Sequence, residues 1–105
     1  EPMTIRGDGE QRRDFTYVKD VVDANIRCAT SLIKWAGEVI NIGNGDNRSV
    51  NDLADMIGGD RINVDPVIEP RQTLADNYRA GNLLDWKPTM KLEDWLPKWK
   101  KELGL

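Results

Sequence analysis

Glycine and proline recur along the whole chain and limit every secondary-structure element to a short segment. Glycine adopts backbone conformations that other residues avoid, and proline cannot donate a backbone hydrogen bond, so both mark turns and element ends. The main breaks are Gly7 and Gly9, Gly37, Gly43 and Gly45, Gly58 and Gly59, Pro66 and Pro88. A chain divided in this way can build only short helices and short strands.

Four segments have the pattern of helices. Apolar residues recur at helical spacing over about residues 19–35 and again over residues 50–57. Ser49 is a suitable N-cap for the second of these, with Asp52 placed for a capping box. Helices are also expected over residues 76–84 and 92–103, where Pro97 should kink or divide the last one.

Short extended segments alternate with these helices. Residues 3–6 alternate apolar and polar side chains, as a half-buried strand does. Further strands are expected at residues 15–18, 38–42 and 62–64, with a weaker candidate at 73–75. The order predicts a mixed α/β fold of short strands and about four helices. At 105 residues, the chain should form a single domain over residues 1–105.

Composition excludes several classes of protein. A net charge of -3 argues against a general nucleic-acid binder, which needs a clustered basic face. No apolar stretch is long enough to cross a membrane. The lone Cys28 rules out a disulfide framework and fits a reducing cytoplasm, where we expect this protein to reside. Histidine is absent, so the commonest acid–base catalyst and metal ligand is missing.

The glycine turns do not match known phosphate-binding loops. A dinucleotide site requires G-x-G-x-x-G, and the third glycine is missing after both Gly7-Asp8-Gly9 and Gly43-Asn44-Gly45. A Walker loop is excluded because no Gly-Lys pair occurs. The sequence therefore predicts no catalytic residue, no bound cofactor and no metal site in this chain.

The segment from Gly7 to Val21 carries the strongest functional signal. It places Arg12 and Arg13 after a tight turn, and a planar guanidinium matches the oxygens of a phosphate group. The alternative is that both arginines form surface ion pairs with nearby aspartates. Residue chemistry alone leaves the two interpretations open.

Three segments together resemble a known family. Residues 7–21, G-D-G-E-Q-R-R-D-F-T-Y-V-K-D-V, are similar to a hallmark of the extended short-chain dehydrogenases/reductases, in the UDP-glucose 4-epimerase and sugar-nucleotide dehydratase branch. Residues 39–53 and 69–88 resemble two further family stretches, Y-N-I-G-x-G…S-V-x-E-L and G-E-x-R-x-x-x-A-D…L-G-W-x-P. The resemblance covers essentially the whole chain.

The resemblance implies a role in binding. Such enzymes hold NAD(P) and a catalytic Tyr-x-x-x-Lys in a Rossmann domain, and this chain resembles only their C-terminal substrate-binding portion. Neither tyrosine of this chain is followed by the lysine of that pair, because four residues after Tyr17 comes Val21 and four residues after Tyr78 comes Asn82. We therefore expect the chain to lack the Rossmann domain and to be inactive alone. Its expected partners are a UDP-, GDP- or dTDP-sugar and the missing Rossmann domain, or a second copy through the face that the domain would cover.

The resemblance also implies site residues. Arg13 takes the place of the family's diphosphate-binding arginine, and Gln11 is a weaker contact in the same turn. The family's second phosphate arginine is replaced by Pro66, and Arg71 is a possible substitute. Asn41 is expected mainly in the scaffold beneath the site.

Several residues of the matched segments have an expected structural role, and one alternative function stays open. Asp14, with Phe15 and Val18, should fix the loop of the motif and its packing, and Trp86 should be buried. The loss of an arginine at Pro66 favours the alternative function, a self-associating or protein-docking module derived from the family.

Overall fold

The computed structural model describes all residues, 1–105, and has eight short elements. The strands are β1 (Met3–Arg6), β2 (Arg12–Arg13), β3 (Arg48–Ser49) and β4 (Arg61–Val64). The helices are α1 (Val18–Thr30), α2 (Val50–Ile57), α3 (Tyr78–Leu84) and α4 (Leu92–Leu103). The predicted mixed α/β fold with four helices and short strands is confirmed.

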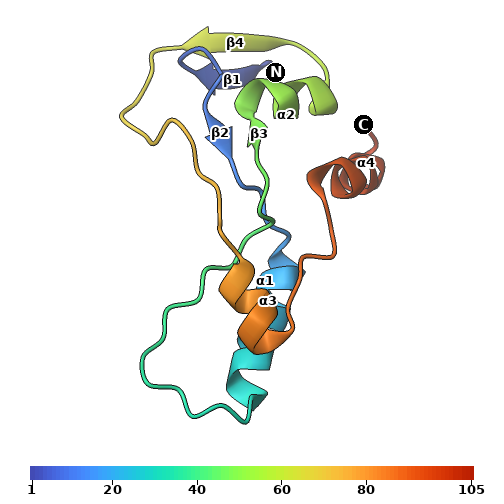
Figure 1. Ribbon diagram of the computed structural model, residues 1–105. Helices are drawn as coiled ribbons and strands as arrows, with labels where there is room; N and C mark the ends of the chain where they lie inside the picture. Colours follow the sequence, from blue (N-terminus) through green and yellow to red (C-terminus); the bar gives the residue numbers. More distant parts are fainter.

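The strands form two small sheets at one end of the molecule (Figure 1). β1 pairs in parallel with β4, and β2 pairs antiparallel with β3. α2 follows β3 directly and leads to β4, so it lies beside both sheets. Its predicted capping box is present: the Ser49 hydroxyl accepts from the Asp52 amide, and the Asp52 carboxylate accepts from the Ser49 amide.

α1 and α3 lie side by side at the other end (Figure 1). Ala24 of α1 and Ala80 of α3 are buried in their interface, because small side chains let two helices approach closely. Leu84 and Trp86 complete this cluster, and Trp86 is only 2% exposed, as predicted.

α4 runs without interruption from Leu92 to Leu103, so Pro97 does not divide it, and the alternative of a kink stays a prediction. Proline at this position removes a single helical hydrogen bond, the one to the Glu93 carbonyl. Packing offsets this loss, since Leu96 is buried and Trp95 stacks on Trp99 with ring centroids 5.8 Å apart. None of the helices has the length and apolarity needed to span a membrane.

Three predicted strands are absent, at residues 15–18, 38–42 and 73–75. A strand requires a hydrogen-bonded partner, and residues 38–42 make no hydrogen bond between backbone groups. Among the backbone groups of residues 38–42, only the Val39 carbonyl has a hydrogen-bond partner. This partner is the Arg79 side chain, which donates to it at 2.8 Å. Near residues 73–75, Gln72 forms an isolated bridge to Arg12.

α1 also ends at Thr30 instead of near Trp35. The Ser31 hydroxyl accepts a hydrogen bond from the Ile33 amide at 3.1 Å. Such a local side-chain bond gives the backbone an alternative to the next helical turn.

The molecule is elongated, and its apolar core is small. It measures 50 × 33 × 17 Å with a radius of gyration of 16.6 Å, whereas a compact chain of this length has about 13 Å. Only 12 of 105 residues are buried. Val18, Val22 and Ile26 form a stripe along α1 and are 68%, 50% and 56% exposed.

Asp20 connects α1 to the segment between α3 and α4. It lies in the first turn of α1 and is 4% exposed. Its carboxylate accepts the Thr89 hydroxyl at 2.6 Å and the amides of Thr89 and Met90 at 2.8 and 3.3 Å. Its backbone carbonyl accepts the Trp86 indole N–H at 2.9 Å. The connection between α3 and α4 is therefore fixed to α1 by polar bonds.

We predict that Asp20→Ala lowers the free energy of unfolding by about 3 kcal/mol, because buried donors lose a charged acceptor. Urea unfolding followed by tryptophan fluorescence measures this. Asp23→Ala is the matched control: Asp23 is on the same helix, and its carboxylate, 46% exposed, pairs only with Arg27. Its loss should stay below about 0.5 kcal/mol. Equal losses for the two variants would contradict the role given to Asp20.

Candidate functional site

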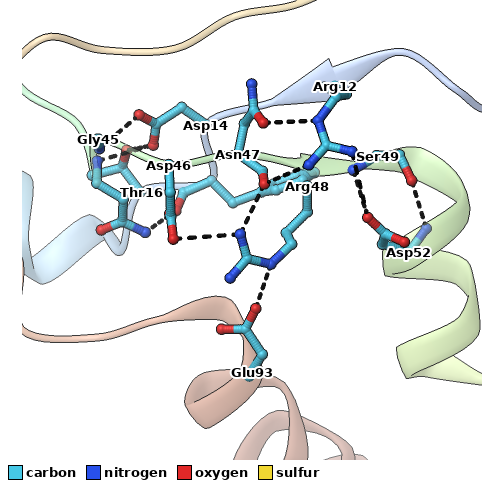
Figure 2. Close-up of polar contacts among 12 residues, drawn as sticks. Arg12, Asp14, Thr16, Gly45, Asp46, Asn47, Arg48, Ser49, Asp52 and Glu93 are labelled. Atoms are coloured by element: carbon cyan, nitrogen blue, oxygen red, sulfur yellow. Dashed lines mark hydrogen bonds and ion pairs between the residues drawn. The ribbon is translucent and has the colours of Figure 1, made fainter.

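Arg12 and Arg13 point in different directions because they are successive residues of β2, and side chains alternate along a strand. The Arg12 guanidinium is committed to the scaffold (Figure 2). It donates to the Asn47 side-chain oxygen at 2.8 Å and to the Asn47 carbonyl at 3.0 Å, and it lies 3.9 Å from the Asp52 carboxylate. Arg12 thus anchors β2 to the segment before α2.

Arg13 contacts a different part of the chain. One terminal guanidinium nitrogen donates to the Arg12 carbonyl at 2.7 Å, and the other terminal nitrogen lies 3.1 Å from a carboxylate oxygen of Glu69. The two side chains are 24% and 30% exposed, so the pair is half-buried. The predicted aspartate partners of a surface ion pair do not contact Arg13, and Glu69 takes that place.

A cavity of about 290 Å³ lies beside this pair. Its lining consists of the first glycine turn and the segment after β4: Gly7, Asp8, Gln11, Pro66, Val67, Glu69, Pro70 and Arg71. Two of the predicted site residues, Gln11 and Arg71, therefore share one cavity. Arg13 does not line this cavity and is connected to it only through its ion-pair partner Glu69. Glu69 is the first residue of the segment 69–88, which resembles a family stretch, but the sequence pattern predicts no site role for it.

Gln11 and Arg71 are both held in place. Gln11 is 6% exposed and its side-chain amide donates to the Arg6 carbonyl at 3.0 Å. The two terminal nitrogens of Arg71 donate to the two carboxylate oxygens of Asp8 at 2.9 and 3.0 Å. This pairing lowers the pKa of Asp8 to about 2, mainly through the hydrogen bond from Arg71, and raises the pKa of Arg71.

Asp14 is the acceptor that organises the loops around the site (Figure 2). Its carboxylate accepts the amides of Asn44, Gly45 and Ala75 at 2.9, 3.0 and 3.1 Å, and the Thr16 hydroxyl at 3.1 Å. The expectation that Asp14 fixes the loop is confirmed by these bonds, whereas Val18, which was expected to pack there, is 68% exposed.

Gly43 is required by this arrangement. A Cβ at this position would lie 2.4 Å from the Ala75 Cβ and 2.9 Å from an Asp14 carboxylate oxygen. Any larger residue would push the two loops apart.

Asn41 does not line the cavity that contains Gln11 and Arg71. It is exposed and lines a separate shallow cavity of about 380 Å³, together with Asp14, Thr16 and Ala75. The structure therefore divides the predicted site residues between two places, with Asn41 alone in the second.

Known proteins match the chain over nearly its whole length. A sequence profile described as the NAD dependent epimerase/dehydratase family matches residues 1–43. The UDP-glucuronate 4-epimerase of Thermodesulfobacterium geofontis is 33% identical over 113 residues, which cover 97% of this chain and 34% of that protein. The UDP-glucose 4-epimerase of Mycolicibacterium smegmatis is 34% identical over 101 residues, which cover 90% of this chain and 32% of that protein.

The fold matches as well. The crystal structure of UDP-glucuronic acid 4-epimerase from Bacillus cereus, in complex with UDP-glucuronic acid and NAD, superposes with a TM-score of 0.88 at 36% identity. The match covers 98% of this chain and 36% of that one. The chain belongs to the NAD-dependent epimerase/dehydratase family.

Membership in the NAD-dependent epimerase/dehydratase family confirms the resemblance drawn from the three segments. The chain spans about a third of the length of these relatives, 32% and 34% of the two sequences and 36% of the solved chain. The part of the family that it represents includes the Gly7–Val21 motif, since that motif lies within the residues matched by the profile.

The ion pair between Asp8 and Arg71 predicts a measurable titration. The carboxylate form of Asp8 is favoured in the folded chain, so its contribution to stability is present above pH 3.8 and is lost as the pH falls toward about 2. Carboxyl chemical shifts measured by NMR should give a midpoint near 2 for Asp8. Arg71→Gln should move this midpoint toward 3.8, the value of an unpaired aspartate. A wild-type midpoint already near 3.8 would show that the pair does not form.

Proposed function

We propose that this chain binds the nucleoside diphosphate of a sugar nucleotide, as the C-terminal substrate-binding part of an NAD-dependent epimerase or dehydratase. The observation that carries the proposal is the ion pair of Arg13 with Glu69, a residue that lines one cavity together with Gln11 and Arg71. The Bacillus cereus relative was solved with UDP-glucuronic acid and NAD, which supports a UDP-sugar as the first ligand to test.

The geometry of β2 supports Arg13 as the phosphate-binding group. Arg12 is bonded to Asn47 and lies near Asp52, so its donors are committed to the scaffold. Arg13 has one guanidinium nitrogen on a backbone carbonyl, and the other meets only Glu69. A guanidinium offers a fork of donors that matches phosphate oxygens, and it stays charged at any working pH.

Arg71 is a second phosphate contact in this proposal, but a weaker one. Both of its terminal nitrogens are bonded to Asp8. The arginine lost at Pro66 is therefore replaced by a side chain that already has a partner. Gln11 supports the turn through its bond to the Arg6 carbonyl and lines the same cavity.

We also propose that NAD is held outside this chain, and that the chain has no turnover alone. The amides of Asn44 and Gly45, which a phosphate would need at the second glycine turn, already donate to Asp14. The first glycine turn leads from β1 to β2 and not into a helix, so it offers no helix N-terminus for a pyrophosphate. The binding energy of the nucleotide would help to orient the reacting sugar in the whole enzyme.

A second candidate function is a self-associating or protein-docking module of the same family. The exposed stripe of Val18, Val22 and Ile26 along α1 favours it, because exposed apolar surface promotes association. In this alternative the covered surface is α1, and the cavity near Arg13 has no ligand.

Isothermal titration calorimetry with UDP, GDP and dTDP tests the first proposal. We expect the wild-type chain to bind at least one of them and Arg13→Gln to weaken that binding roughly 10- to 150-fold, because a charge-assisted hydrogen bond is worth about 1.5–3 kcal/mol. Arg79→Gln is the control, since it removes the same charge on α3, where Arg79 contacts the Val39 carbonyl. No heat with any nucleotide would contradict the proposal and favour the association module.

A further inference from the structure

The outward face of α1 is apolar and exposed. Val18, Val22 and Ile26 lie on it, whereas Asp20 and Ala24 on the opposite side of the helix are buried. We infer that this face binds the same face of a second copy of the chain, with the two α1 helices antiparallel about a two-fold axis at Val22. This inference rests on the second candidate function, self-association, and does not depend on nucleotide binding.

The stripe on α1 is complementary to itself. Its three residues are four positions apart, so they follow one another along a single helix face. In an antiparallel pair centred on Val22, this residue meets its own copy, and Ile26 of each helix meets Val18 of the other. Every residue of the stripe therefore has an apolar partner, as a contact between two identical surfaces requires.

A cavity of about 290 Å³ between the start of α1 and the start of α4 continues the stripe at Val18. Its lining is mainly apolar and consists of Phe15, Thr16, Tyr17, Val18, Met90, Lys91, Leu92 and Trp95. Because Ile26 of the second copy lies opposite Val18, its side chain reaches the edge of this cavity. Each copy thus supplies both halves of the contact, a projecting isoleucine and an apolar hollow.

The charges beside the stripe favour the antiparallel arrangement. Lys19 and Asp23 lie one helical turn apart on the same flank of the stripe. The two-fold axis sets this flank against the same flank of the second helix, so Lys19 of each copy lies near Asp23 of the other. Lys19 forms no ion pair within the chain, and one Asp23 oxygen contacts only Arg27. A parallel pair would set this flank against the uncharged one, which carries Val21 and Asn25.

Sedimentation velocity without nucleotide tests the dimer. We expect the wild-type chain to form a discrete dimer at roughly 10–100 μM. Val22→Asp should raise the dissociation constant by about tenfold or more, because two carboxylates then face each other at the two-fold axis. Val67→Asp is the matched control: Val67 is also 50% exposed and lies between β4 and α3, so the dimer should persist. A monomeric wild type, or a dimer that Val22→Asp leaves unchanged, would overturn the inference.

Cysteine cross-linking tests the orientation, in a Cys28→Ala background that removes the one native thiol. Val22→Cys should form a disulfide between two copies. A mixture of Val18→Cys and Ile26→Cys chains should cross-link to each other in preference to themselves, and preferential self-linking of Val18→Cys would indicate a parallel pair and overturn the inference. Calorimetry with UDP reports separately on nucleotide binding, so a monomer that binds UDP overturns this inference and leaves that proposal standing.

Discussion

Four hydrogen bonds converge on the Asp14 carboxylate and join chain segments that no sheet connects. The donors are the Thr16 hydroxyl and the amides of Asn44, Gly45 and Ala75. The segment between β2 and α1 is thereby tied to the second glycine turn and to the chain that precedes α3. Polar bonds take this role because the molecule buries so few side chains. Asp20, six residues later in the same motif, does the same for the connection between α3 and α4.

This scaffold decides which partner each of the two adjacent arginines meets. Asp14 follows β2 directly, and its bonds fix the end of the strand that carries Arg12 and Arg13. Because side chains alternate along a strand, Arg12 then bonds to Asn47, and Arg13 meets Glu69. The acidic residues of the Gly7–Val21 motif act as structural acceptors, and Arg13, which pairs with Glu69, is the basic residue that we propose for a ligand. A motif read as a binding signal is therefore largely an architectural one.

The sequence predicted elements that depend on local chemistry and missed those that depend on distant partners. The capping box of Ser49 and the helix over residues 92–103 need only neighbouring residues, and both were predicted correctly. The apolar segment at residues 38–42 was predicted as a strand, but in this chain no other strand pairs with it. Glu69 was missed for the same reason, since its contact with Arg13 joins residues that lie 56 positions apart.

Amide hydrogen exchange of the Asp14 donors tests the central role of this carboxylate most directly. The account predicts that the amides of Asn44, Gly45 and Ala75 are protected in the wild-type chain, and that Asp14→Asn lowers their protection together, by about tenfold or more. The Gly58 amide, which bonds to Ala54 at the end of α2, should keep its protection in both. Exchange of the three donor amides at the rate of an unstructured peptide in the wild type would contradict the account.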